Sequence, residues 1–353
     1  MISINGAYLE GGGQIIRTAL ALSTITQKPF EVYDIRKGRK EPGLKNQHLY
    51  CVKSLQDLCN AKAEGANLGS LFLKFYPDSI AAKNLTIEIG TAGSITLLLQ
   101  ALLPPLLFAG KSTTLSITGG TDVRWSPSFD YFNNVLLPQL QRFAKIEAKL
   151  LKRGYYPKGN GKVEIKINPK FKSSDNTNKI NLIEQHHLIQ IKGISHASIN
   201  LEKGRVAERQ AHAAQSALAK KFNVPITISS HYQDTLSTGS GITLWAIFSK
   251  NKDDINENNP IRIGSDSLGE QGKMAESVGE EAALSLIKEI ESKSPVDKHL
   301  ADQLLLFMAM FGSSKIKVSE ITEHCKTNIY AIQKFLGEIF EINEQENEIF
   351  TKK

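Results

Sequence analysis

Residues 10–27 begin with Glu10-Gly-Gly-Gly-Gln-Ile-Ile-Arg17 and continue in a helical pattern, with apolar side chains at Ile15, Ile16, Leu20 and Leu22. Residues at this spacing lie on one face of a helix. The glycines predict a bare backbone turn before the helix, whose unpaired N–H groups and dipole attract phosphate. Glu10 can then hold a divalent cation, and Arg17 can reach phosphate oxygens. Taken alone, a flexible turn with a surface Glu and Arg is the commoner structure, and no Walker A loop follows.

Helix and strand patterns recur along the chain and predict the α/β (α+β) class. The first unit continues with a helix over 47–59 and a strand over 70–76. The second unit has strands over 85–89 and 113–118, helices over 92–108 and 126–143, and a hairpin of 146–151 with 161–167. The third unit has helices over 301–311 and 328–336 and strands over 316–321, 340–343 and 348–351.

A block of different character separates the second unit from the third. It contains strand patterns over 188–191 and 242–248 and amphipathic helices over 207–220 and 275–292. The polar run 172–179 leads into it, and the polar stretch 250–259 reads as a loop tip. A contiguous block that interrupts a repeat is typical of an inserted domain. We therefore expect a body over 1–180 and 281–353 and an inserted α/β domain over 181–280.

Composition narrows the class of protein. The 353 residues are 41% hydrophobic and 22% charged, as in an ordinary globular protein. The net charge of +7 is compatible with a polyanionic partner without requiring one. Three widely spaced cysteines argue against a disulfide framework and a zinc site. With no leader pattern at the N-terminus, and an apolar stretch over 95–110 too short to span a bilayer, we expect a cytoplasmic protein without a membrane segment.

Three loops can carry ligand-binding groups. Residues 36–48 hold five cations within ten positions, broken by glycine and proline, and either contact phosphates or form a solvated basic loop. Residues 90–94 are small and lead into a helix that carries Gln100, whose buried amide needs a partner, either a nucleotide or a neighbouring backbone group. Residues 119–122 precede a helix with Tyr131, which either stacks on a base or packs in the core.

The C-terminal part offers a nucleophile. His324 follows a predicted strand and precedes the last predicted helix, where its imidazole can be exposed. A neutral imidazole nitrogen is a competent nucleophile toward the α-phosphate of ATP. A lone histidine is more often structural or simply exposed. Cys325 beside it has no evident base, so a thiol nucleophile is discounted.

Taken together, these elements resemble the RNA 3'-terminal phosphate cyclase family over nearly the whole chain. The resemblance rests on their order and spacing. The matching segments are 10–17, 35–39, Pro42-Gly43-Leu44 with Gln47-His48, Gly93-Ser94 with Gln100, 119–122, Arg153-Gly-Tyr-Tyr-Pro157, Ala301-Asp302-Gln303, and His324 with Thr327-Asn328.

The resemblance implies three βαβαββ repeats, each similar to the C-terminal domain of bacterial translation initiation factor 3, and a smaller inserted α/β domain. It implies a ligase-type enzyme of RNA processing that uses ATP as substrate, with Mg²⁺ or Mn²⁺, and acts on RNA with a 3'-phosphate end. His324 is the implied nucleophile: it takes up AMP, passes it to the RNA 3'-phosphate, and the neighbouring 2'-OH then closes a 2',3'-cyclic phosphate.

The resemblance also implies the site residues. Glu10 is the metal-binding position. The ATP-binding set is Arg17, Gln100, Tyr131, His299, Leu300, Ala301, Asp302 and Gln303. The set for the RNA 3'-phosphate is Arg36, Arg39, Gln47 and His48, although the resemblance does not divide these residues sharply between ATP and RNA.

The sequence departs from the bacterial pattern at two places. His299 stands where bacterial members carry tyrosine, and residues 123–125 replace a plainer, proline-rich run, as in archaeal-type or eukaryotic-type members. One rival is the non-catalytic cyclase-like ribosome-biogenesis factor, which lacks the nucleophile. Another is an enolpyruvyl transferase, which needs a longer chain. The oligomeric state is open, and a homodimer is one assembly that fits.

Overall fold

A computed structural model of the chain describes residues 1–170, 179–251 and 260–352. The predicted polar lead-in over 172–179 falls almost wholly outside these ranges, and most of the predicted loop tip over 250–259 does so as well. Within the described residues, no helix has the length and apolar character needed to cross a membrane. The mixed α/β class predicted from the sequence is confirmed.

The first unit alternates strands and helices and ends in a hairpin. In chain order it contains β1 (Ile2–Asn5), α1 (Gln14–Thr26), β2 (Phe30–Tyr33), α2 (Asn46–Cys59), β3 (Lys62–Glu64) and β4 (Leu73–Tyr76). Its sheet has the order β1-β2-β4-β3, in which β1 and β2 are parallel and the other pairs are antiparallel. The C-terminal ends of β1 and β2 therefore meet at one edge.

The second unit repeats this order. It contains β5 (Leu85–Glu88), α3 (Ile95–Leu106), β6 (Thr113–Gly119), α4 (Phe129–Tyr131), a π-helical turn η1 (Phe132–Leu136), α5 (Leu137–Leu140), β7 (Ala144–Lys152) and β8 (Gly161–Pro169). The sheet order is β5-β6-β8-β7, which corresponds strand by strand to the first sheet. The helix predicted over 126–143 thus runs continuously from Phe129 to Leu140 and contains a π-helical turn.

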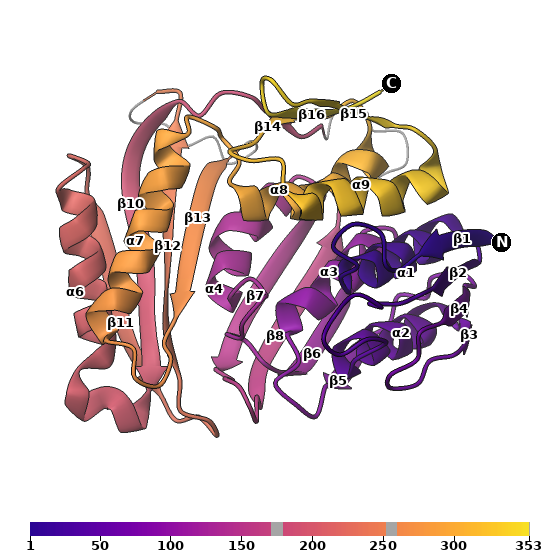
Figure 1. The fold of residues 1–353 in the computed structure, drawn as a ribbon, viewed down its shortest axis with the longest axis horizontal. Helices are drawn as coiled ribbons and strands as arrows, with labels where there is room; N and C mark the ends of the chain where they lie inside the picture. The colour runs from indigo at the N-terminus through magenta and orange to yellow at the C-terminus, as the bar shows by residue number, and fades with distance from the viewer. Residues whose placement is uncertain (171–178, 252–259, 353) are drawn as a thin grey trace.

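The third unit is split by the inserted domain. It contains β9 (Asn181–Leu182), α8 (Lys298–Phe311), β14 (Lys315–Lys317), α9 (Glu323–Leu336), β15 (Phe340–Asn343) and β16 (Glu348–Thr351). Its sheet has the same order again, β9-β14-β16-β15. The helices of the three units pack on one another in the middle of the body, with α1 against α2, α3 and α9 and with α8 against α9 (Figure 1).

The inserted domain has its own sheet and two helices. It contains β10 (His187–Ser198), the 3-10 turn η2 (Ile199–Gly204), α6 (Val206–Ala219), β11 (Ile226–Gln233), β12 (Ser240–Ser249), β13 (Ile261–Leu268) and α7 (Ala275–Glu291). The sheet order is β11-β10-β12-β13, and α6 and α7 pack side by side on its outer face (Figure 1).

The domain boundaries differ from the expected ones at 180/181 and 280/281. Strand β9 pairs with β14 and so belongs to the body. Helix α7 runs without interruption through residue 280 and packs on α6, β12 and β13. Burial of its apolar face against the inserted sheet, rather than any change in local sequence, decides to which domain α7 belongs.

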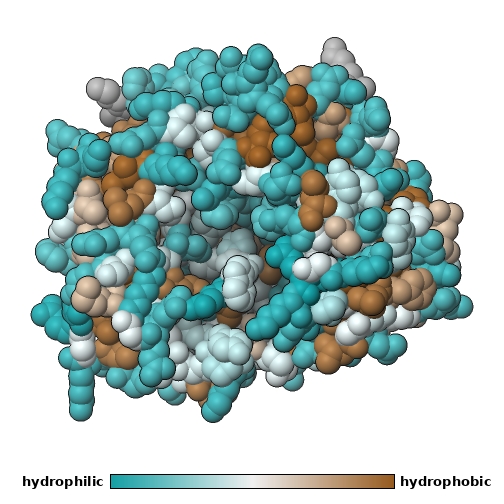
Figure 2. All heavy atoms as spheres, in the orientation of Figure 1, coloured by the Kyte–Doolittle hydropathy of each residue, from teal (hydrophilic) through white to brown (hydrophobic). Residues whose placement is uncertain are grey.

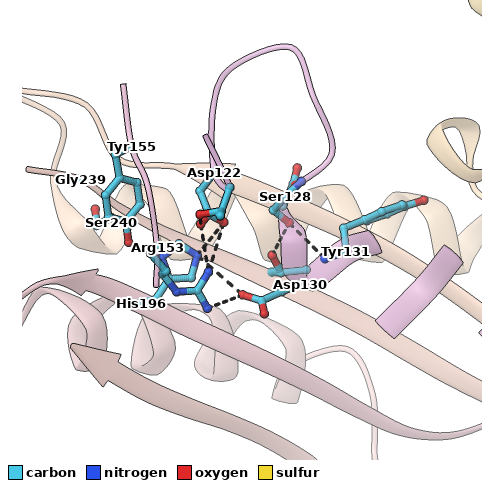
Figure 3. A network of polar contacts seen from close by, with 12 residues as sticks. Asp122, Ser128, Asp130, Tyr131, Arg153, Tyr155, His196, Gly239 and Ser240 are labelled. Carbon is cyan, nitrogen blue, oxygen red and sulfur yellow. Dashed lines mark hydrogen bonds and ion pairs between the residues drawn. The ribbon is translucent and has the colours of Figure 1, made fainter. Parts of the chain in front are cut away.

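A buried ionic cluster joins the inserted domain to the body (Figure 3). We call it the joint cluster; its members are Asp122, Asp130, Arg153, Tyr155 and His196. Arg153 donates from Nη1 to Asp122 Oδ2 over 3.0 Å and from Nη2 to Asp130 Oδ2 over 2.6 Å. His196, on β10 of the inserted domain, lies with Nδ1 2.7 Å from the Tyr155 hydroxyl and Nε2 3.4 Å from Asp122. The segments around Asp122 and Arg153, quoted for the resemblance, therefore lie at a domain interface.

The joint cluster contains a set of groups that resembles a metal site. Ligand atoms of Asp122, Asp130 and His196 lie within 4.8 Å of one another. The Arg153 guanidinium, however, already donates hydrogen bonds to both carboxylates. A buried arginine paired in this way balances the two negative charges, so we assign the cluster a structural role.

Candidate active site

The N-terminal ends of α1 and α9 meet at a second cluster of polar side chains. We call it the His324 cluster; its members are Glu10, Gln14, Arg17, Asp302 and His324. Gln14 and Arg17 are one turn apart on α1 and so lie on the same face of that helix. Asp302 comes from α8, and His324 from α9. Segments from the first and third units thus build this cluster together.

The first turn of α9 holds His324. The predicted strand over 316–321 ends early, at Lys317, and α9 begins at Glu323 rather than at 328. Thr322 caps the helix, because its hydroxyl accepts a hydrogen bond from the Cys325 N–H over 3.2 Å. The His324 side chain is 54% exposed. The imidazole is therefore fixed on a rigid helix end and is open to solvent.

The Gln14 amide orients the His324 ring. Its Nε2 donates to Asp302 Oδ2 and to the His324 carbonyl oxygen, each over 3.2 Å, and this places Oε1 toward the imidazole. Oε1 lies 2.8 Å from His324 Nδ1. Since an amide oxygen only accepts, Nδ1 carries the proton and donates it. The lone pair of the neutral ring is then on Nε2.

The partial burial of His324 favours the neutral ring. Burial lowers the pKa of His324, and the positive charges of Arg17 and Arg39 lower it further, whereas Glu10 acts in the opposite direction. For Asp302, burial raises the pKa of the carboxyl to about 7 despite the nearby Arg17. The cluster therefore combines an imidazole with a lowered pKa and a carboxyl with a raised pKa.

Glu10 is suited to a divalent cation. The Oε2 atom of Glu10 is buried and lies 2.7 Å from His324 Nδ1. This oxygen nevertheless forms no hydrogen bond of good geometry with any described residue. A buried carboxylate oxygen without a donor is costly unless a cation balances it. Carboxylate oxygens are also the ligands that Mg²⁺ and Mn²⁺ prefer. The residues present thus fit the metal that the resemblance implies.

A pocket opens beside the cluster. Its polar lining includes Gln14, Arg17, Gln100, Asp302, Gln303 and Asn328. Arg17 donates from Nε to Gln100 Oε1 over 3.1 Å, which answers the buried amide noted in the sequence. The face of the molecule seen in Figure 2 is hollowed near its centre and bordered largely by hydrophilic side chains.

Four of the eight residues predicted to bind ATP line this pocket: Arg17, Gln100, Asp302 and Gln303. Leu300 and Ala301 are fully buried in the core. Tyr131 is also buried, and its hydroxyl donates to Asp297 over 2.6 Å, so the structure does not bring this ring to the pocket. The next residue, Phe132, lines the pocket instead. His299 is exposed at the start of α8.

The four residues predicted to bind the RNA 3'-phosphate fall into different environments. Arg36 donates to the carbonyl oxygens of Glu41 and Gly43 and so holds the basic loop together. His48 is buried, which lowers its pKa to about 3. Gln47 is half-buried on α2, and Arg39 is exposed.

The glycine turn explains where Arg39 and His48 lie. A Cβ atom on Gly13 would come within 1.9 Å of His48 Nε2, so only glycine fits beside that ring. A Cβ atom on Gly12 would lie 3.5 Å from Arg39 Nη2. No described residue forms an ion pair or side-chain hydrogen bond with Arg39. Its guanidinium therefore stands beside the turn with its donors available.

Sequence reasoning assigned no role to Gln14 or Asn328. Asn328 Nδ2 donates to the Asp302 carbonyl oxygen over 2.7 Å, and its Oδ1 accepts from Thr18. A signal for Gln14 was present, because it is a polar residue one turn before Arg17 and directly after the glycine turn. Only the approach of α9 to α1 gives these two amides their partners.

Comparison with known proteins identifies the family. A family model described as RNA 3'-terminal phosphate cyclase matches residues 8–342. Proteins named RNA 3'-terminal phosphate cyclase are similar to this chain over nearly their whole length. The one from Pyrococcus furiosus is 45% identical over 97% of this chain and 95% of its own. The one from Archaeoglobus fulgidus is 43% identical over 96% of this chain and 97% of its own. The chain therefore belongs to the RNA 3'-terminal phosphate cyclase family and is an enzyme of that family.

Proposed function

We propose that this enzyme converts RNA 3'-phosphate ends to 2',3'-cyclic phosphates at the expense of ATP, with His324 as the covalent nucleophile. The observation that carries the proposal is the Gln14 amide, which holds Nδ1 of His324 and leaves the lone pair on Nε2. The ring is exposed, and its lowered pKa keeps it neutral at physiological pH. A fixed and unprotonated imidazole is what nucleophilic attack requires.

In the first step Nε2 of His324 attacks the α-phosphorus of ATP. A P–N bond forms and the bond to pyrophosphate breaks. In the second step an oxygen of the RNA 3'-phosphate attacks the same phosphorus, so AMP leaves the histidine and the imidazole is restored. In the third step the 2'-OH attacks the 3'-phosphorus, loses its proton, and releases AMP. Nucleophile and electrophile share one ribose in this last step, which makes it an intramolecular reaction.

Arg17 and Glu10 have distinct parts in this scheme. The Arg17 guanidinium donates to the neutral amide of Gln100 rather than to a carboxylate, so its charge is available to the phosphates of the nucleotide. Glu10 would hold Mg²⁺ or Mn²⁺ through its buried Oε2. When bound, such a cation offsets the negative charge of the triphosphate.

The test is covalent labelling. Incubation with ATP labelled at the α-phosphate and Mn²⁺ should leave acid-labile, alkali-stable label on the protein, and His324→Ala should abolish it. His212→Ala is the matched control, because His212 is an exposed histidine on α6 of the inserted domain. An unlabelled wild type under Mg²⁺ and Mn²⁺ would favour the non-catalytic relative, and a labelled His324→Ala variant would move the nucleophile elsewhere.

The final step has its own readout. A 3'-phosphorylated oligoribonucleotide should acquire an end that resists phosphatase. The same oligomer with a 2'-deoxy terminal sugar has no internal nucleophile, so the adenylylated 3'-end should accumulate. The adenylylated end also resists phosphatase but still carries AMP, so a phosphatase-resistant end without AMP on the 2'-deoxy oligomer would contradict the proposed ring closure.

A further inference from the structure

Large apolar side chains are exposed at one edge of the first sheet, close to the turn that carries Glu10. Tyr8 follows β1 and is 39% exposed, and Tyr33 ends β2 and is 46% exposed. Leu71 and Phe72, just before β4, are 43% and 36% exposed. We call these four residues the aromatic edge. The first sheet lies at the right of Figure 1, far from the inserted domain, so that domain does not cover them.

Backbone pairing brings the segments of the aromatic edge next to one another. Val32 pairs with Leu73, so Tyr33 directly follows and Phe72 directly precedes a paired position on two neighbouring strands. The Ile35 N–H donates to the Leu71 carbonyl oxygen over 3.0 Å. On the other side, the Gly6 N–H donates to the Tyr33 carbonyl oxygen over 2.8 Å, which brings the segment of Tyr8 alongside.

Tyr8 is held in place while still exposed. Its ring stacks on Tyr330 of α9, with centroids 3.9 Å apart and an angle of 16° between the planes. Tyr330 is itself fixed, because its hydroxyl accepts from the Asn5 N–H over 3.2 Å. One face of Tyr8 is thus packed and the rest of the ring is available. A rigid exposed ring loses little conformational entropy when a planar group stacks on it.

Positive charge lies on the basic loop, which leaves β2 directly after Tyr33 of the aromatic edge. Two of its cations are engaged locally, with Lys37 3.1 Å from Asp34 and Lys45 2.7 Å from Glu41. Arg39 and Lys40 are exposed, and neither forms an ion pair or side-chain hydrogen bond with any residue in the described ranges. Arg39 stands beside Gly12, so this free charge begins at the glycine turn.

Exposed rings flanked by free cations match the chemistry of single-stranded nucleic acid. Bases stack on aromatic side chains, and Lys and Arg contact the phosphates between them. We propose that the aromatic edge, with Arg39 and Lys40, binds the unpaired nucleotides immediately upstream of the RNA 3'-phosphate. This inference rests on the proposed function, because it takes the RNA end to be at His324. A protein partner or a second copy of the chain would leave the free cations without a role.

The test measures how the KM for RNA depends on oligomer length. In the wild type, KM for 3'-phosphorylated oligoribonucleotides should fall as nucleotides are added beyond a dinucleotide. Stacking of a base is worth about 1–3 kcal/mol, which converts to about 5- to 150-fold. Tyr33→Ala with Phe72→Ala should therefore raise KM for a ten-nucleotide substrate about tenfold or more and leave the dinucleotide unaffected. Tyr33→Phe with Phe72→Tyr should retain the wild-type behaviour.

Tyr76→Ala is the matched control. Tyr76 is on the same face of β4 as Phe72, but it lies at the C-terminal end of the strand, whereas Phe72 precedes the N-terminal end. Labelling by ATP without RNA checks that the double variant is folded. Should that labelling be lost, Lys40→Glu, on the exposed loop, gives the second measurement and should raise KM for the long oligomer alone. Unchanged length dependence in both variants would overturn the proposal, as would a dimer that the double variant dissociates without any change in KM.

Failure of the proposed function would look different. In that case the wild type would take no label from ATP. Binding of a fluorescent 3'-phosphorylated ten-nucleotide RNA, measured by anisotropy, would still report on the aromatic edge. The affinity should fall in Tyr33→Ala with Phe72→Ala and not in Tyr76→Ala. Equal affinities in these proteins would remove the surface from consideration whether or not His324 is adenylylated.

Discussion

The joint cluster and the His324 cluster are built from the same residue types and behave in opposite ways. Each combines a histidine, carboxylates and an arginine. In the joint cluster the side chains of His196 and Asp122 are 1% and 0% exposed, and Arg153 donates to two carboxylates. In the His324 cluster the histidine is 54% exposed, and Arg17 donates to an amide. Pairing the arginine stabilises an interface, whereas leaving its charge available makes a binding site.

The two buried carboxyls show the same contrast. Burial would raise the pKa of Asp122, but the charges of Arg153 and His196 hold it well below its usual range. Burial raises the pKa of Asp302 to about 7, because Arg17 compensates only in part. A group that is ionised and paired contributes to stability, whereas one held near its titration point does so less and remains responsive to a ligand.

The largest loss of stability is expected when the joint cluster is disrupted. Arg153→Met leaves two buried carboxylates without the guanidinium that donates to both, and loss of one partner of a buried pair costs about 3–5 kcal/mol. Urea denaturation should show this loss in the free energy of unfolding. Arg209→Met is the control, because Arg209 pairs with Glu276 on the surface and should cost about 1 kcal/mol or less. A loss below 1 kcal/mol for Arg153→Met would contradict the structural role.

The second expected effect is on the pH dependence of stability. Here the substitution Asp302→Asn should stabilise the protein, whereas Arg153→Met should destabilise it. The Asp302 carboxyl has a higher pKa in the folded protein than in the unfolded chain, so the folded state binds the proton more tightly between about pH 4 and 7. The free energy of unfolding should fall as pH rises through that window.

Asp302→Asn should flatten this dependence and raise stability at pH 8 by about 2–4 kcal/mol. Labelling by ATP should weaken in the same variant, since a pocket residue is altered. Denaturation curves at pH 5 and pH 8 measure the first effect, with Asp57→Asn, an exposed aspartate on α2, as control. An unchanged pH slope would show that Asp302 is ionised in the folded state.

The smallest effect on stability is expected at Glu10, where a substitution should change metal binding instead. Glu10→Gln keeps the size of the side chain but removes the charge that would balance a divalent cation. The Mn²⁺ concentration for half-maximal labelling should rise about 10- to 100-fold, while the free energy of unfolding stays within about 1 kcal/mol. Glu320→Gln, an exposed site before α9, should leave the metal dependence unchanged. Equal metal dependence in both variants would clear Glu10 of the role.

Much of the fold could be predicted because it depends on local patterns. The apolar spacing after the glycine turn gave α1, and the strand and helix patterns gave most of the elements of the first two units. Helix boundaries were less predictable. Thr322 is a good cap residue, but the sequence near it also resembled a strand, so the prediction started α9 at 328 instead of 323.

The site was predicted only in part, since its contacts are between distant segments. Gln14 and His324 are 310 positions apart and meet because α1 packs on α9. Tyr131 and Phe132 are adjacent, but only Phe132 lines the pocket, because successive helix residues point in different directions and tertiary packing sets which one faces it. No local pattern contains that information.

The sequence by itself determined the family, the glycine turn and the candidate nucleophile, because these depend on residue types in a fixed order. Only the tertiary structure decided the two roles of the charged residues. It sealed Asp122 and His196 around Arg153 and left His324 open, with Nδ1 held by Gln14. The physical reason is that burial and pairing set the protonation state and reactivity of a charged group, and both depend on what is packed around it.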